Sequence, residues 1–531
     1  MPNRPGVPWL LAAAVTALAV AVAVMPSGAV ATPGHGHTTH HVSHRAAEQA
    51  LQHARDLLST SGKAHARRSQ GPGDLTLALR RVWLARTSLT GADRRAASGL
   101  LARPTDTGGD NLCYVDDPCP VRLTQTADRI TTHFVIHYTT ATGRNRATRT
   151  FVDAVAHTLE HVYATETGMG FRTPVSDGAT AHPGDIGNPN GKFDVFLADT
   201  GRYGVYGYTN IDATTSTAPQ QPAYLVLDNN FSTSKFCFSR PCTPPLDSMR
   251  VTVAHEFFHA IQFAYDVFED TWLMEGSAVW MEDRVYDGIN DYRQYVADSP
   301  IRYPRTPVDH DGFTDVYGAF TVFKFLTGWM HDPAAVRQVW ERTAAPDVYS
   351  LQAVDDVILR HHHSLRAAYA HFGVWNTLPP GSYPGERAGY GAAGYWKSQR
   401  LSRSHRSTGT LTTGLRHLAN APLRLLPARG LSRHQRLRVT VNLPAASRGA
   451  VATVQVRGRH GSLSLMMVPL DRYGNGHRVV AFAPRRISSV VVVLTNGSTR
   501  MRACPDNPDP YTCGGHGTYD GDTYRVRANL T

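Results

Sequence analysis

One apolar helix in the middle of the chain constrains the fold more than any other segment. The stretch VTVAHEFFHAIQFAYD, residues 251–266, is rich in large hydrophobic side chains at helical spacing. Asp247 or Ser248 can cap this helix, and we expect it to end near Asp266. A helix this apolar belongs in a core, so its polar side chains are either satisfied there by hydrogen bonds or serve a site.

The polar side chains of this helix have the spacing of a metal site. His255 and His259 are four residues apart, so both imidazoles project from one face and can bind one metal ion. Glu256 follows the first histidine, where its carboxylate can reach a metal-bound water without being a ligand. This is the HExxH pattern, in which zinc lowers the pKa of its water and the glutamate accepts the proton. The pattern alone is weak, because a chain with 26 histidines can contain it by chance.

A catalytic zinc ion needs a third protein ligand and one open position. The HExxHxxGxxH pattern is excluded, because Ala260-Ile261-Gln262 follows His259. Glu269 and Asp270, in the loop after the helix, are two candidates for the third ligand. The next segment is TWLMEGSAVWMED, residues 271–283.

The segment Trp272-Leu273-Met274-Glu275-Gly276-Ser277-Ala278 resembles the WLxEGxA segment of gluzincins, a branch of the zincin metallopeptidases. The resemblance implies that Glu275 is the third zinc ligand, on a helix beside the HExxH helix. It also implies that Glu282 hydrogen-bonds a zinc-binding histidine, which fits the general need to orient imidazoles. Fifteen residues separate His259 from Glu275, fewer than in the best-known gluzincin aminopeptidases.

The span from about Asp74 to Leu326 is similar to a group of secreted bacterial proteins that are predicted metalloproteases. This similarity implies an α+β fold in which a zincin-like catalytic domain combines a mixed sheet with active-site helices. Tyr317, in DVYGAF, is a candidate donor to the oxyanion or an aromatic packing residue, and His310 is a weaker candidate for the donor role.

Four segments are predicted along the chain. Residues 1–31 have an apolar run and small residues at Ala29 and Ala31, which predicts a secretory signal peptide rather than a membrane span. Residues 32–104 are a His-rich tail followed by a helical segment, either a propeptide or an N-terminal subdomain. Residues 105–385 form the zincin-like domain, and residues 395–531 alternate like the strands of a β-sandwich.

Two further segments are candidates for binding substrate or a second metal ion. The resemblance to zincins implies an edge strand beside the active-site helix, to which an extended peptide substrate could add, and we expect AYLVLDNNF, residues 223–231, to be that strand. DIGNPNGKFD, residues 185–194, fails the EF-hand register and is interpreted as an Asx-rich turn, with calcium as a minor alternative.

Cysteine usage and charge agree with export. The six cysteines form three close pairs, each predicted to be a disulfide: Cys113 with Cys119, Cys237 with Cys242, and Cys504 with Cys513. The net charge of +11 suits either contact with anionic cell walls or simply a soluble basic exported protein. No basic stripe with interleaved aromatics indicates nucleic-acid binding.

The sequence therefore predicts a secreted zinc metallopeptidase that acts on peptides or proteins. Zinc would be held by His255, His259 and Glu275, with Glu256 as general base. One alternative is a non-catalytic secreted binding protein with a structural zinc and a sandwich that contacts cell wall or glycan. Another is a zinc hydrolase that acts on a non-peptide amide.

Overall fold

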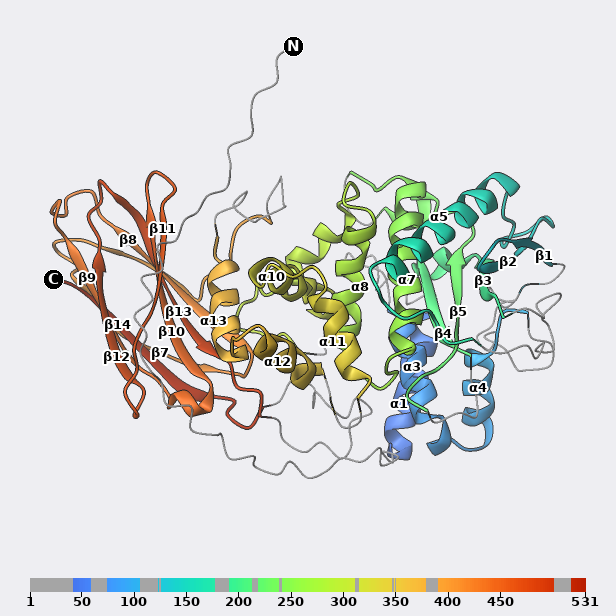
Figure 1. Cartoon of the computed structure of the whole chain (residues 1–531), viewed down its shortest axis with the longest axis horizontal. Coiled ribbons are helices and arrows are strands. Elements are labelled where there is room, and N and C mark those ends of the chain that lie inside the picture. The colour runs from blue at the N-terminus through green and yellow to red at the C-terminus, as the bar shows by residue number, and fades with distance from the viewer. Residues whose placement is uncertain are drawn as a thin grey trace, which may run out of the picture.

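The computed structural model describes residues 42–58, 74–105, 123, 126–176, 191–212, 218–237, 241–310, 315–345, 348, 350–378, 390–500 and 517–531. Within these residues the predicted α+β class is confirmed, with helices and three sheets (Figure 1). The predicted signal peptide, the turn at residues 185–190 and two of the predicted cysteine pairs lie outside the described residues.

The N-terminal helices pack into the same hydrophobic core as the sheet that follows them. They are α1 (His44–Leu57), α3 (Leu75–Ala85) and α4 (Gly91–Leu101). Nine of the eleven residues of α3 are buried, because β4 (Gly207–Ile211) covers one side and α1 and α4 cover another. Arg80 of α3 is also buried, and its guanidinium donates to the carbonyls of Val267 and Glu269 at 2.6 and 2.5 Å.

The central sheet is mixed and has the order β1-β2-β3-β5-β4. The other strands are β1 (Thr126–Ile130), β2 (Phe134–Thr139), β3 (Phe193–Ala198) and β5 (Ala223–Asp228). β2, β3 and β5 are parallel, and the outer strands β1 and β4 are antiparallel to their neighbours. The helices α5 (Arg149–Gly168) and α7 (Pro245–Phe263) pack against this sheet.

The predicted edge strand is wrong. β5, the strand of the AYLVLDNNF segment, lies inside the sheet between β3 and β4, so both of its backbone edges are already paired. The edge strand next to β5 is β4, and two of its backbone amides already have side-chain acceptors. The Thr209 amide donates to Thr76 Oγ1 at 2.9 Å, and the Ile211 amide donates to Asn210 Oδ1 at 2.9 Å. Strand order depends on how the chain crosses over, which the alternation of residues does not encode.

The helix that carries the HExxH pattern begins earlier than predicted. α7 starts at Pro245 with Pro244 as its N-cap, rather than at a cap provided by Asp247 or Ser248. Proline suits the first helical position, because its missing amide would have no partner inside the helix. Fifteen residues of α7 are buried, including all those from Val251 to Phe263.

A helical layer continues the chain toward the C-terminal sheets (Figure 1). It contains α8 (Thr271–Val285), which packs on α7, and then α9 (Asp315–Gly318), α10 (Phe320–Trp329), α11 (Ala335–Thr343), α12 (Ser350–Arg360) and α13 (Leu365–Trp375). The short α6 (Thr233–Phe236) precedes α7. The helices up to α13 share one core with the central sheet.

Two sheets at the C-terminal end enclose a second core. The five-stranded sheet has the order β11-β10-β13-β8-β6, and the four-stranded sheet has the order β12-β9-β14-β7. Their strands are β6 (Lys397–Leu401), β7 (Ser407–Leu415), β8 (Ala419–Pro427), β9 (Arg436–Asn442), β10 (Ala450–Gly458), β11 (Leu463–Met467), β12 (Asn475–Ala481), β13 (Ile487–Asn496) and β14 (Asp522–Leu530). The two sheets therefore form a sandwich.

The sandwich is attached to the rest of the protein through its five-stranded sheet. Val374 of α13 packs on Val491 and Val493 of β13. His417 lies between Asp309 and Asp520, at 2.7 Å from Nε2 and 2.9 Å from Nδ1, and its side chain is fully buried. The four-stranded sheet is on the side turned away from α13 (Figure 1).

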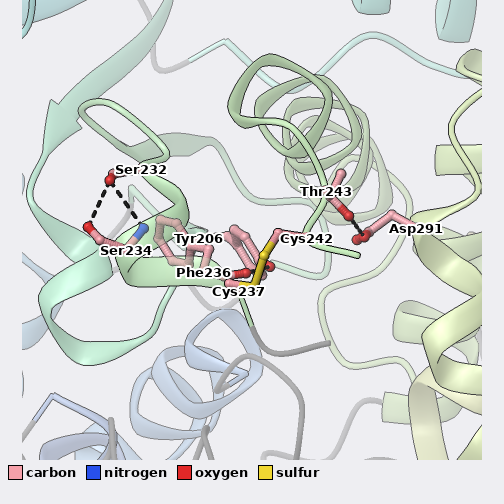
Figure 2. The surroundings of a disulfide bond; sticks show 8 residues. All are labelled: Tyr206, Ser232, Ser234, Phe236, Cys237, Cys242, Thr243 and Asp291. Carbon is pink, nitrogen blue, oxygen red and sulfur yellow. Dashed lines mark hydrogen bonds between the residues drawn. A yellow bond between two sulfur atoms is a disulfide. The ribbon is translucent and has the colours of Figure 1, made fainter. Parts of the chain in front are cut away.

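One predicted disulfide lies among the described residues and is confirmed. Figure 2 shows the bond between Cys237 and Cys242 beside the stacked rings of Tyr206 and Phe236. It closes the short loop that leads into α7. Among the helices that the structure describes, none has the length and apolarity needed to cross a membrane.

Candidate metal centre

Three predicted ligand side chains meet between α7 and α8. The nitrogen and oxygen atoms that His255, His259 and Glu275 offer lie within 4.8 Å of one another. The two carboxylate oxygens of Glu275 each lie 3.1 Å from the Nε2 atom of one histidine. The two histidines are one turn apart on α7, and the packing of α8 on α7 brings Glu275 opposite them.

The donor atoms suit a divalent metal ion. His259 and Glu275 are completely buried, yet His259 Nε2 and Glu275 Oε1 have no hydrogen-bond partner, although they lie 3.1 Å apart. Buried polar atoms without partners are costly, and these two point at a common position. Two imidazole nitrogens and one carboxylate form a ligand set that zinc accepts.

Each histidine is oriented by a second contact. Glu282 Oε1 lies 2.7 Å from Nδ1 of His255, as the resemblance implied. Gln262 Oε1 lies 2.8 Å from Nδ1 of His259, and its amide nitrogen donates to Met274 O at 2.9 Å. Sequence reasoning missed Gln262. Such contacts fix ring orientation and leave Nε2 facing the metal position.

The charges of the site affect proton binding. Burial raises the pKa of Glu275, but His259 and His255 lower it more, so that it falls to about 2. Burial lowers the pKa of His255, but Glu275 and Glu282 raise it well above its ordinary value. Burial also raises the pKa of Glu282 to about 7, despite the opposing effect of His255. A metal ion at Nε2 of His255 would have to displace a proton.

Glu256 is held beside this cluster by residues from two distant segments. Its Oε2 accepts a hydrogen bond from Thr76 Oγ1 at 2.9 Å. Thr209 Oγ1 lies 3.0 Å from the same oxygen and 2.6 Å from the backbone oxygen of Glu256. Thr76 belongs to α3 and Thr209 to β4, so the N-terminal helical segment contributes to the site.

A small cavity lies in front of the cluster. Its volume is about 40 Å³, which has room for an ion and a few waters. Tyr317 lines it, with its ring centre 6.0 Å from that of His255 and 4.8 Å from that of Tyr295. Burial raises the pKa of both tyrosines well above the ordinary value, so each keeps its proton. Asp74 and Tyr295 line the cavity too, and sequence reasoning missed both.

The rival residues lie elsewhere. Neither Glu269 nor Asp270 belongs to a group of three clustered ligands, and the group at Glu275 is the only such group within the described part of the chain. Asp270 accepts a hydrogen bond from Ser350, and Glu269 lies at the loop that Arg80 binds. His310 pairs with Asp315 at 2.9 Å and does not line the cavity.

A scan of the sequence against known protein families finds no family that matches, and a search of curated proteins finds no relative. The function proposed below therefore rests on the geometry and chemistry of the site.

Proposed function

We propose that the protein is a zinc-dependent hydrolase of the gluzincin type that cleaves peptide bonds. The observation that carries the proposal is the combination of three clustered ligands with a fourth carboxylate, that of Glu256, which is held nearby by two threonines. A purely structural metal site has no need of that extra carboxylate. The mixed sheet and the packed pair α7 and α8 support a zincin-like fold for this part of the chain.

His255, His259 and Glu275 would hold the ion. When bound, zinc lowers the pKa of a water molecule and polarises a carbonyl oxygen. Glu256 accepts the proton of the attacking water and then donates it to the leaving amine. Thr76 and Thr209 keep the Glu256 carboxylate in place, so little reorganisation is needed when the proton moves.

Tyr317 completes the proposed set of groups. Its retained proton makes it a hydrogen-bond donor, and its position in the cavity wall suits an oxygen that becomes negative in the transition state. Tyr295 stacks on it at 4.8 Å and limits its movement. Export of the protein is part of the proposal, and the Cys237–Cys242 disulfide supports it, because such bonds persist in oxidising compartments.

The decisive experiment replaces Glu256 by glutamine. The amide has the same shape and can still accept from Thr76, so the fold and the zinc content should be unchanged. Hydrolysis of a mixed peptide library, measured by mass spectrometry with and without a chelator, should fall about 10²- to 10⁴-fold. Glu341→Gln, on the exposed face of α11, is the matched control.

Three results would count against the proposal. Full hydrolysis by Glu256→Gln would refute the role of that carboxylate. Cleavage that resists the chelator would refute the metal. A wild-type protein that binds zinc but cleaves no peptide in the library would favour a structural zinc site in a binding protein, or hydrolysis of a non-peptide amide.

A further inference from the structure

The net positive charge of this protein comes from its C-terminal sandwich. Residues 395–531 contain 20 arginines and one lysine against five aspartates, a net charge of +16. The whole chain carries +11, so residues 1–394 carry −5. Nearly all of the cationic groups in the sandwich are guanidinium groups, which bind sulfate, phosphate and carboxylate through two parallel hydrogen bonds.

Four of these arginines form a line across the outer face of the four-stranded sheet. In β9 the exposed residues alternate with buried ones, and Arg436 and Arg438 are exposed. In β14 Arg525 and Arg527 are exposed in the same way. We call these four residues the arginine stripe.

The register of the two strands sets the order of the stripe. Arg527 lies opposite Thr440, one outward position beyond Arg438, and Arg525 lies opposite Asn442, one position further. The charges therefore follow one another as 436, 438, 527 and 525, crossing from β9 to β14. Outward residues on a strand are about 6.7 Å apart, so the stripe is roughly 20 Å long.

The stripe is not neutralised by the protein. None of its arginines forms an ion pair with a carboxylate in the described residues, and Arg525 and Arg527 contact only neutral groups: Asn442, Asn529 and Ser407. The exposed positions of β7, β9, β12 and β14, all described, include no aspartate or glutamate. Asp522, at the start of β14, pairs with Arg448 instead. Four like charges so placed repel one another and favour an anionic partner.

The neighbours of the stripe indicate the kind of partner. Exposed hydroxyl, amide and imidazole groups flank it on β9 and on the adjacent strands β7 and β12: Thr410, Thr412, Thr440, Asn442, Asn475 and His477. The exposed positions of these four strands carry no phenylalanine, tyrosine or tryptophan. Proteins that bind single-stranded nucleic acid stack bases on such rings, so this face lacks that element. Sugar hydroxyl groups, by contrast, match the polar flanks.

We propose that the arginine stripe binds a linear anionic polysaccharide, one that carries sulfate or carboxylate groups along its chain. The four-stranded sheet lies on the side of the sandwich turned away from α13, α8 and α7 (Figure 1). A polymer bound to its outer face would therefore leave the site between α7 and α8 unobstructed. Binding would hold the protein at a polyanionic surface. This role is independent of the proposed hydrolase activity.

Binding of the full-length chain to fluorescent dextran sulfate and to polygalacturonate tests the proposal, with neutral dextran as the blank. One variant changes all four arginines of the stripe to glutamine. The matched control removes the same number of charges from exposed loop positions of the sandwich, through Arg→Gln changes at Arg403, Arg429, Arg485 and Arg486.

The stripe variant should bind the polyanions about tenfold or more weakly, whereas the control should change the affinity by about twofold, since exposed charges that lack a defined partner contribute little. A stripe variant with four lysines should lie between the wild type and the glutamine variant, because lysine keeps charge without the planar fork. Unchanged melting temperatures verify folding, and the pair Arg438→Gln and Arg527→Gln serves if the fourfold variant fails to fold.

Equal losses in the stripe and control variants would overturn the proposal, because net charge alone would then explain binding. Unchanged binding by the stripe variant would overturn it as well. The wild type could also bind oligothymidylate as tightly as dextran sulfate and lose this binding equally in the stripe variant. The proposed polysaccharide ligand would then be overturned in favour of a nucleic acid.

Discussion

Replacing Thr76 by valine tests whether the N-terminal helical segment is part of the metal site. The Thr76 hydroxyl donates to Glu256 Oε2 and accepts from the Thr209 amide, both at 2.9 Å, and the residue is 3% exposed. Valine keeps the shape but leaves the Thr209 amide without a partner and removes one donor from a carboxylate. Each loss costs about 1–3 kcal/mol, so the free energy of unfolding should fall by about 2–6 kcal/mol.

Urea unfolding followed by tryptophan fluorescence measures this change, since Trp83 and Trp272 are buried in the core concerned. Peptide hydrolysis should fall as well, because the Glu256 carboxylate is held less firmly. Thr76→Ser is the matched control: it keeps both hydrogen bonds and loses one methyl group, at a cost of about 1 kcal/mol. If the Thr76→Val and Thr76→Ser variants were equally stable and equally active, the assigned hydrogen bonds would be refuted.

Two further predictions concern single contacts. The pKa of His417 is raised from 6.5 to about 9, because Asp309 and Asp520 together outweigh the lowering by burial. The folded state thus binds this proton more tightly than the unfolded state, and the stabilisation, on the order of 3 kcal/mol, is complete below pH 6.5 and is lost as the pH rises through 9. Between pH 6.5 and pH 9, the melting temperature should fall more steeply with pH for the wild type than for His417→Asn. Parallel curves would contradict the role assigned to the His417 proton. Separately, Gln262→Leu should weaken zinc binding about 10- to 100-fold in a chelator competition, because His259 loses its orienting partner, whereas Gln262→Glu should retain most of the affinity. Equal affinities of the leucine and glutamate variants would exclude that role.

Helical spacing explains why the two histidines could be predicted from sequence, whereas Glu275 and Glu282 were implied by the resemblance to gluzincins. His255 and His259 are one turn apart on α7, and Glu275 and Glu282 are two turns apart on α8. Positions so spaced share a helix face, so local sequence contains most of the geometry. Gln262 could have been found in the same way, because it follows His259 by three residues. The metal and the reaction remain predictions.

Contacts between distant segments could not be predicted. Thr76 is 180 residues from Glu256, and nothing in the sequence around Thr76 distinguishes it from other threonines. The order of β4 and β5 depends on the same kind of long-range arrangement, so the assignment of AYLVLDNNF as the edge strand, made by analogy with zincins, was wrong. Burial of α3 on several sides likewise follows from its neighbours rather than from its own pattern.

The two hydrogen bonds between Arg80 and the α7–α8 loop also bear on how the protein folds during synthesis. Arg80 donates to the carbonyls of Val267 and Glu269, which lie 187 and 189 residues further along the chain. Both residues belong to the loop between the helices that carry the candidate ligands. During synthesis, α3 leaves the ribosome long before this loop exists, and contacts so far apart in sequence form slowly. The ligand set of His255, His259 and Glu275 is therefore complete only after about half of the polypeptide has been made.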